Sequence, residues 1–204
     1  MVNPNSSPSL FTSLFHPRTT FQALALSSPS PLRILLLYSL WLILLPPLCS
    51  WWGAYLFGWR LGASEPLLFE PPILTLISAA YFLTLFFGLF TTALISRWMA
   101  STYGANDALG LHVALITVVG TPLAFASIAH LFPHVFFNVV VLIPTTIWSM
   151  YLLYTGIPIV LNIPPERGML MSTSLVGWLL VGAVSILGLS VGLWTVGIGP
   201  SIAV

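Results

Sequence analysis

The sequence predicts an all-α integral membrane protein, a bundle of five transmembrane helices with a short amphipathic amino-terminal segment. Hydrophobic residues make up 58% of the 204 residues and charged residues only 4%, and the mean hydropathy is +1.03. Soluble domains carry roughly 25% charged residues, so a soluble protein with this surface would precipitate. The few charges also divide the chain into long apolar runs, and these runs give the number of spans.

Two runs of 26 uncharged residues, 34–59 and 71–96, each fit one helix, because ~20 residues cross the ~30 Å of hydrocarbon. A third uncharged run, 108–165, has 58 residues and would form a helix of ~87 Å, far too long for one span. It therefore folds back once, at the segment HLFPH. The 37 residues after Arg167 leave room for one more span. The expected spans are residues 32–57, 72–97, 109–130, 135–161 and 169–197.

The arginines predict how these spans are oriented. With five spans, Arg60 falls on one side of the membrane. The other four arginines fall on the amino-terminal side: Arg18, Arg33, Arg97 and Arg167. Cytoplasmic loops carry the excess of basic residues, so we expect the amino terminus in the cytoplasm and the carboxyl terminus outside.

Residues 1–30 differ from the rest of the chain and are expected to form a cytoplasmic or interfacial segment before the membrane domain, residues 31–204. The stretch SLFTSLFHPRTTFQALAL spaces leucines and phenylalanines among polar residues. This spacing allows a short amphipathic helix in the membrane interface, with Pro17 at its start. The pattern is equally compatible with an ordinary lead-in and with a dedicated docking helix.

Prolines interrupt the apolar runs in several places. They are Pro46, Pro47, Pro122, Pro144 and Pro158. Kinked helices can line a cavity or form a hinge. Bundles that only pack also contain them, because neighbouring helices and Ser or Thr side chains bond the freed carbonyls. Packing is the interpretation that the sequence favours.

The last run is rich in glycine. Gly188 and Gly192 form a G-x-x-x-G pair, a spacing that lets two helix backbones approach closely. Such a pair is compatible with dimerisation, but we expect it to pack against another span of the same bundle.

Side chains that could carry chemistry are few. Asn138 is the one strongly polar residue well inside a run; it could bind a ligand, but an interhelical hydrogen bond is the favoured role. His130 and His134 have the i, i+4 spacing of metal ligands, but Pro133 lies between them and no Cys or acid stands near. We therefore expect no metal there.

Enzyme signatures are missing as well. The one cysteine, Cys49, lies inside the first span, and no G-x-S-x-G, H-E-x-x-H or phosphate loop occurs. We expect a protein that is not an enzyme, with no cofactor and no nucleic-acid partner.

The stretch YLLYTGIPIVLNIPPERG, residues 151–168, joins spans four and five. Gly156 and Pro158 should bend or end span four, and Glu166 and Arg167 should lie in the short loop that follows. The order of residues resembles the signature of the Yip (Ypt/Rab-interacting protein) family, in particular its bacterial inner-membrane branch. The matching residues are Tyr151, Leu152, Leu153, Tyr154, Gly156, Pro158, Pro165, Glu166 and Arg167.

The resemblance covers roughly Leu10 to Gly197, because Pro17 and Phe21 match the P…F segment that precedes the first span in this family. It implies five spans, a cytoplasmic amino terminus, a location in the bacterial inner membrane, and no established activity. The chain lacks the long amino-terminal region of the eukaryotic trafficking relatives, which argues against a Rab-type GTPase partner.

Two functions remain open. The first is a non-enzymatic membrane scaffold or accessory subunit, which packs in the bilayer on partner membrane proteins or on a second copy. The second is a small transporter or channel whose path the proline-broken helices line. A structure separates them, since pore-facing polar residues favour transport.

We expect the motif itself to act as a shaped corner. Tyr151 and Tyr154 are three residues apart, so both should lie on roughly one helix face with their hydroxyls toward water. Glu166 and Arg167 could pair with each other, or with charged residues of the loop between spans two and three, Arg97 and Asp107.

Overall fold

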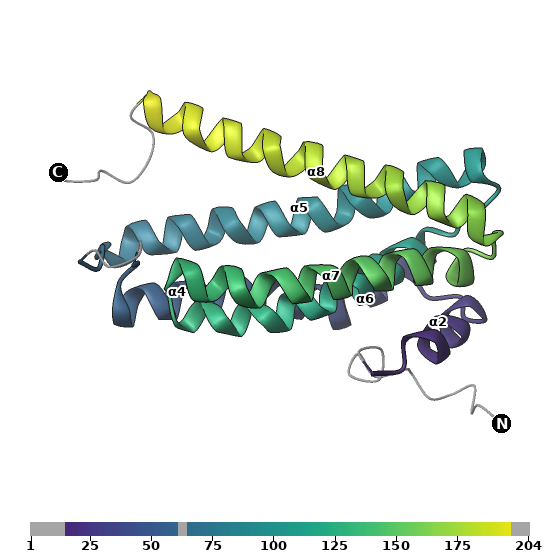
Figure 1. Ribbon diagram of the computed structural model, residues 1–204, viewed down its shortest axis with the longest axis horizontal. Helices are drawn as coiled ribbons and strands as arrows, with labels where there is room; N and C mark the ends of the chain where they lie inside the picture. The colour runs from purple at the N-terminus through teal and green to yellow at the C-terminus, as the bar shows by residue number, and fades with distance from the viewer. Residues whose placement is uncertain (1–14, 61–64, 197–204) are drawn as a thin grey trace.

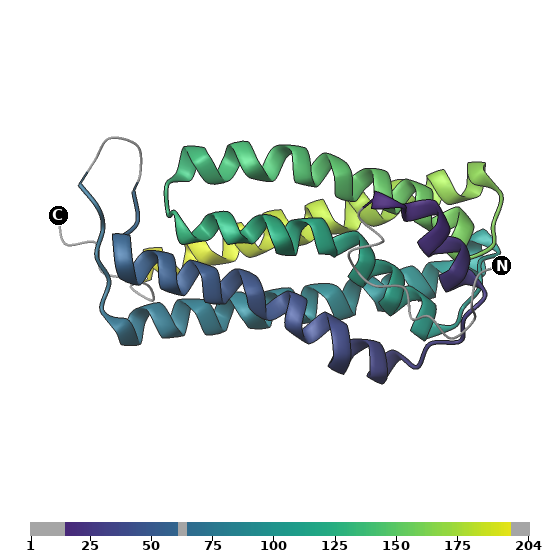
Figure 2. The same ribbon diagram turned by 90° about the horizontal axis from the view of Figure 1, so that it is seen from below.

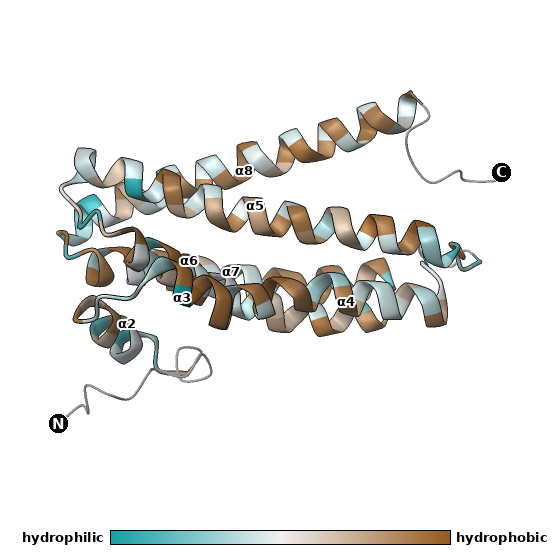
Figure 3. Cartoon of the chain, turned by 180° about the vertical axis from the view of Figure 1, so that it is seen from behind, coloured by the Kyte–Doolittle hydropathy of each residue, from teal (hydrophilic) through white to brown (hydrophobic). Residues whose placement is uncertain are grey.

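The computed structural model describes residues 15–60 and 65–196. Its helices confirm the prediction of an all-α membrane protein with five spans. The five helices long and apolar enough to cross a membrane are Pro31–Phe57, Pro71–Tyr103, Leu109–Leu131, Val135–Val160 and Pro165–Leu193. Figure 3 shows hydrophobic residues along these helices and most of the hydrophilic ones near their ends.

The elements follow one another without a strand in the described part of the chain. They are α2 (Pro17–Ala25), α3 (Pro31–Ile34), the π-helical segment η1 (Leu35–Ser39), α4 (Leu40–Phe57), α5 (Pro71–Tyr103), α6 (Leu109–Ala126), the 3₁₀ turn η2 (Ser127–Leu131), α7 (Val135–Val160) and α8 (Pro165–Thr195). The first span therefore consists of α3, η1 and α4, and the third of α6 and η2.

Helix boundaries follow local chemistry more closely than they follow the charges. Proline, which suits the first turn of a helix, begins α2, α3, α5 and α8. The helix α5 runs past Arg97 to Tyr103 and ends at Gly104, whose φ is 69°, a backbone conformation that glycine adopts without strain. The last span begins at Pro165. Glu166 and Arg167 thus lie in the first turn of α8, and their expected place in a loop was wrong.

Helix α6 is the centre of the bundle. It packs against α7, α5 and α4, and Figure 2 shows it between α4 and α7. In the most apolar 18-residue stretch of this span, about 61% is buried, against 6% in the corresponding stretches of α5 and α8. Helix α8 packs on α7 and α5 but diverges from both toward its carboxyl end (Figure 1). The molecule is therefore densely packed around α6 and open along α8.

The two ends of the bundle are different. We call the end that carries α2 and the connections α5–α6 and α7–α8 the α2 end, and the opposite one the Arg60 end. At the Arg60 end the backbone of Arg60 bonds to the α6–α7 turn, through Arg60 N to Pro133 O (3.0 Å) and Val135 N to Arg60 O (3.4 Å). The main hydrophobic cluster, which includes Phe21 and Leu161, gathers side chains from the α2 end.

The prolines of the spans lie inside continuous α-helices. Pro46 and Pro47 are within α4, Pro122 is within α6, and Pro144 and Pro158 are within α7. Pro158 therefore does not end span four, which continues to Val160.

Candidate functional site

The motif region meets the amino-terminal segment at the α2 end. Phe21 of α2 is fully buried, and its ring lies against Gly156 of α7. A Cβ added to Gly156 would come within 2.9 Å of Phe21 Cζ and 2.7 Å of Leu115 Cδ1. Only glycine leaves room for the ring here. Helix α2 is thus a docked helix packed on α7 and α6, and the two segments that carry the family resemblance are in contact.

The corner between α7 and α8 is built from Pro158 and Gly168. A Cβ added to Gly168 would lie 2.9 Å, 3.0 Å and 3.2 Å from the Cβ, Cδ and Cγ atoms of Pro158. The proline ring therefore packs directly on the first turn of α8. The Gly168 amide donates to Pro164 O at 2.9 Å, so this turn of α8 is already regular where the contact is made.

Asn162 forms the turn that closes α7. Its φ is +53°, the one positive φ of a non-glycine residue in the described chain. The amide of Ile163 donates to Pro158 O at 3.1 Å, the six-to-one bond of a Schellman helix end, and Ile163 itself is buried. Asparagine tolerates this left-handed conformation better than most residues. The sequence predicts that residues 162–165 stop span four, and the structure shows that Asn162 makes the turn.

The neighbouring connection, α5–α6, is tied to this corner through Asn106 and His112. The Asn106 amide donates to Leu161 O at 3.0 Å. His112 is fully buried in α6, with Nε2 2.8 Å from Asn106 O and Nδ1 2.8 Å from Ser96 Oγ. A carbonyl only accepts, so these partners assign the proton to Nε2, and Nδ1 accepts from the Ser96 hydroxyl. His112 therefore joins α5, α6 and the connection between them.

Two tyrosine hydroxyls bond to α8. Tyr154 Oη lies 3.0 Å from Thr173 Oγ1, and Tyr103 Oη lies 3.0 Å from Ser174 Oγ. These bonds join the third turn of α8 to α7 and α5. We expected the Tyr154 hydroxyl to point toward water; its bond to Thr173 lies at an exposed position, and this partner was not predicted. Tyr151 is exposed and stacks on Trp148, with ring centroids 5.0 Å apart.

The charged residues of the motif lie on the surface. Glu166 and Arg167 are exposed, and neither forms an ion pair within residues 15–60 and 65–196. Arg167 Nη1 would lie 3.2 Å from a Cβ at Gly104, so its side chain reaches across to the end of α5. Arg97 donates from Nε to the main-chain oxygen of Asp107 at 3.0 Å. The pairings that the sequence suggested for these charges are therefore not formed.

The three remaining predicted packing residues lie away from the motif. No atom comes within 4 Å of a Cβ added to Gly188 or Gly192. The expectation that this pair packs against another span of the bundle was wrong, because α8 diverges there. Asn138 lies at the Arg60 end, where its Nδ2 donates to Phe132 O (2.9 Å) and its Oδ1 accepts from His130 Nδ1 (2.5 Å). It joins η2 to the first turn of α7.

No group of three His, Cys, Asp or Glu side chains within the described ranges could hold a metal ion. His130 is bonded to Asn138, and His134 Nδ1 has no hydrogen-bond partner. That the two histidines bind no metal stays a prediction, and finding stoichiometric zinc or iron in the purified protein would overturn it.

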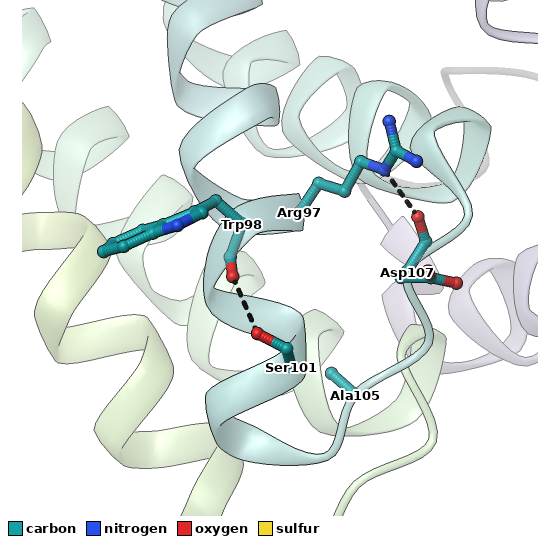
Figure 4. A pocket seen from close by; sticks show the side chains of 5 residues that line it. All are labelled: Arg97, Trp98, Ser101, Ala105 and Asp107. Carbon is teal, nitrogen blue, oxygen red and sulfur yellow. Dashed lines mark hydrogen bonds between the residues drawn. The ribbon is translucent and has the colours of Figure 1, made fainter.

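Two cavities lie near the ends of the bundle. One of about 410 Å³ is at the α2 end, and Figure 4 shows its lining residues, Arg97, Trp98, Ser101, Ala105 and Asp107. The other, of about 260 Å³, is at the Arg60 end and is lined by Phe57, Gly58, Arg60, Phe132, Pro133 and His134.

Comparisons with known proteins bear on the resemblance seen in the sequence. No solved structure matches the chain. It is 27% identical over 153 residues to inner membrane protein YohC of Escherichia coli strain K12, covering 75% of this chain and 78% of that protein. The protein of the same name in E. coli O6:H1 matches to the same extent. The model of the Yip1 domain family matches residues 11–197, which include both α2 and the α7–α8 corner, and the chain therefore belongs to the Yip1 domain family.

Proposed function

We propose that this Yip1-domain protein is a non-enzymatic membrane scaffold or accessory subunit, which packs on partner membrane proteins or on a second copy of itself. The observation that carries the proposal is the contrast between α6, which the bundle encloses, and the two long helices α5 and α8, which it leaves open. A protein built to hold partners needs such side surfaces, supported by a firmly packed frame.

Helix α8 offers the most suitable surface. At about 100° per residue, Gly188 and Gly192 lie about 40° apart on one face of the helix. Because neither meets another atom within 4 Å, a partner helix can approach this face closely. In lipid, close packing of small residues is one of the forces that join helices.

The transporter or channel alternative has less support. Ser39 and Thr117, which are buried between the first span and α6, bond to each other with their hydroxyl oxygens 2.7 Å apart. The Thr121 hydroxyl donates to Thr117 O at 2.9 Å. These polar groups are engaged in packing, and the two cavities described above lie near the ends of the bundle. A transport path would instead need polar groups that are free to exchange partners along the spans.

The absence of enzymatic activity is part of the same proposal. The buried polar side chains at the motif bond to one another or to the backbone, as His112 does with Ser96 and Asn106. Ser96 and His112 form a hydroxyl–imidazole pair, but both side chains are fully buried, which leaves a substrate no access to them. Cys49 is likewise a buried thiol, inside α4.

We place the protein in the bacterial inner membrane, as the name of its E. coli relative suggests, with the α2 end in the cytoplasm. The arginine distribution supports this orientation. Cysteine labelling tests it once Cys49 is replaced: a cysteine at Ser101 should react from the cytoplasm, and one at Leu68, 76% exposed at the Arg60 end, from outside. Ser64, the other position that the sequence suggests for labelling, is outside the described residues. Equal access from one side would contradict the five-span arrangement.

The scaffold proposal is tested by purification in mild detergent, with identification of co-purifying proteins and measurement of the oligomeric state. We expect a stoichiometric membrane partner or a second copy. Gly188→Leu should reduce that association, because a bulky side chain blocks close approach. Gly182→Leu is the matched control, since Gly182 is equally open but lies about 80–120° around the helix from the pair. A monomer without partners, unaffected by either change, would contradict the proposal.

A further inference from the structure

The cavity at the α2 end has a composition that neither the fold nor the proposed scaffold role requires. It measures about 410 Å³ and is lined by one cation, Arg97, one anion, Asp107, and by Trp98, Ser101 and Ala105. Figure 4 shows Arg97 and Asp107 next to each other, with Trp98 on the other side of the helix backbone.

The depth of the cavity relative to the membrane follows from the length of α5. The helix has 33 residues, and at ~1.5 Å per residue it is ~50 Å long, whereas the hydrocarbon layer is ~30 Å thick. Arg97 and Trp98 come after the 26 uncharged residues of this helix, in its last two turns. Tryptophan and arginine are typical of the headgroup layer, and Trp98 is 75% exposed. The cavity therefore opens where lipid headgroups lie.

The charges in the cavity are largely unused. Arg97 donates from Nε to the main-chain oxygen of Asp107 at 3.0 Å, and no other bond of its guanidinium is formed within the described residues. Both terminal nitrogens remain available to an acceptor. The Asp107 carboxylate likewise has no hydrogen-bond or ion-pair partner there. Arg97 and Asp107 are thus bonded through the main chain and not through their charges. This leaves a positive and a negative group beside each other at an open cavity.

We propose that this cavity binds the headgroup of a zwitterionic aminophospholipid, phosphatidylethanolamine. Its phosphodiester suits the terminal nitrogens of Arg97, and its primary ammonium, which has three N–H donors, suits the Asp107 carboxylate. Phosphatidylglycerol has the same phosphodiester but no ammonium, so nothing in its headgroup offsets the repulsion between that phosphate and Asp107. Phosphatidylcholine carries the same charges as phosphatidylethanolamine but has no N–H to donate to the carboxylate.

Native mass spectrometry of the purified full-length protein tests this, with the three phospholipids supplied with identical acyl chains. We expect phosphatidylethanolamine to be retained about fivefold more than either of the others, the size expected of a charge-assisted hydrogen bond that is partly exposed to solvent. Asp107→Asn keeps the main-chain oxygen that Arg97 uses. It should remove the preference over phosphatidylcholine and raise the retention of phosphatidylglycerol. Arg97→Gln keeps an N–H donor and should lower the retention of all three lipids.

Two control variants match these changes in charge. Arg18→Gln removes an exposed arginine of α2, and Glu70→Gln removes an exposed acid at the Arg60 end; neither should change the lipid preference. The melting temperature of each variant shows that it is folded, and Asp107→Asn decides alone if Arg97→Gln is unstable.

Three outcomes would overturn the proposal. The first is equal retention of phosphatidylethanolamine and phosphatidylcholine by the unchanged protein, and the second is an unchanged preference in Asp107→Asn. The third concerns the source of the headgroup: if soluble glycerophosphoethanolamine displaces the lipid at an equal concentration, the ligand is a soluble phosphoethanolamine compound and not the membrane lipid. None of these results depends on whether the protein has a scaffold partner.

Discussion

The α2 end and the far half of α8 use glycine in opposite ways. Gly156 and Gly168 are buried, and a Cβ at either would come within 3.0 Å of a neighbouring side chain. Gly188 and Gly192 meet nothing within 4 Å. The residue type is the same, and so is its setting in a long apolar helix. What differs is whether another element is close, and that depends on where α8 diverges from α5 and α7 (Figure 1).

The contrast separates positions that shape the protein from positions that remain open to contacts outside it. At the α2 end a fully buried aromatic ring, a proline ring and a network of hydrogen bonds join α2, α5, α6, α7 and α8. Along the far half of α8, large side chains such as Leu187 and Leu189 are 66% and 64% exposed. Their exposure is no defect in a bilayer, because lipid tails are as apolar as leucine and do not drive helices together.

The largest expected effect comes from Gly156→Leu. The new side chain would overlap both Leu115 and Phe21, so either α2 leaves its site or α6 and α7 separate. Overpacking of a core costs about 1–3 kcal/mol or more, and we expect a clearly lower melting temperature in detergent and lower expression. Gly182→Leu, at an open position, is the control and should melt like the unchanged protein. Equal melting temperatures for the two variants would remove the distinction between the regions.

A double-mutant cycle sharpens this result. If Gly156 serves to admit the Phe21 ring, the destabilisation by Gly156→Ala should shrink when Phe21→Ala is already present. Residues in direct contact show coupling free energies of about 0.5–3 kcal/mol. If the two losses of stability are additive, Gly156 makes room for Leu115 of α6 and not for Phe21 of α2.

The next effect in size is expected at the turn after α7. Asn162→Ile places a β-branched residue at a φ of +53°, which costs about 1–2 kcal/mol and should lower the melting temperature. Asn162→Gly removes the same side chain without this strain, so it should leave the melting temperature unchanged or slightly higher. If the glycine variant is the less stable one, the asparagine side chain and not the backbone conformation holds the corner.

A smaller effect is expected from the tyrosine that joins α7 to α8. Tyr154→Phe removes the hydroxyl that bonds Thr173, and the free energy of unfolding should fall by about 0.5–1.5 kcal/mol. Tyr151→Phe is the matched control one turn earlier, because no hydrogen bond of the Tyr151 hydroxyl is formed within the described residues. A larger loss in Tyr151→Phe would show that the Tyr151 hydroxyl has a partner that the isolated chain does not contain.

The spans and the family could be predicted because their signals are local. Apolar runs bounded by charges count helices in a membrane protein, and the residues from Tyr151 to Arg167 are contiguous in the chain. The predicted helix boundaries were less accurate, because a charged residue does not by itself end a helix. The helix α5 passes Arg97 and stops at Gly104, and α8 begins at Pro165, before Glu166. Pro and Gly at these positions were the available signals.

The contacts of the site could not be predicted, because they join segments that lie far apart in the sequence. Phe21 and Gly156 are separated by more than a hundred residues, and so the glycine gives no local sign of what it admits. The same holds for Ser96, His112 and Asn106, whose bonds depend on how α5 and α6 meet. The G-x-x-x-G pair is the opposite case. Its spacing is a local sequence pattern that favours helix contact, but no contact forms there within the single chain.

The smallest effect is expected at Glu166, the acidic residue of the motif. Glu166 lies in the first turn of α8, where a negative charge is favoured by about 0.3–1 kcal/mol at most and less in salt. It is exposed and unpaired in the described chain, so Glu166→Gln should leave the melting temperature nearly unchanged. The fall in melting temperature of Gly156→Leu is the reference for this comparison. Should Glu166→Gln fold normally yet lose a partner that co-purifies with the unchanged protein, while Gly156→Leu retains it, the motif binds that partner through its charge. The corner would then be a recognition site, and shape would no longer explain why these residues occur together.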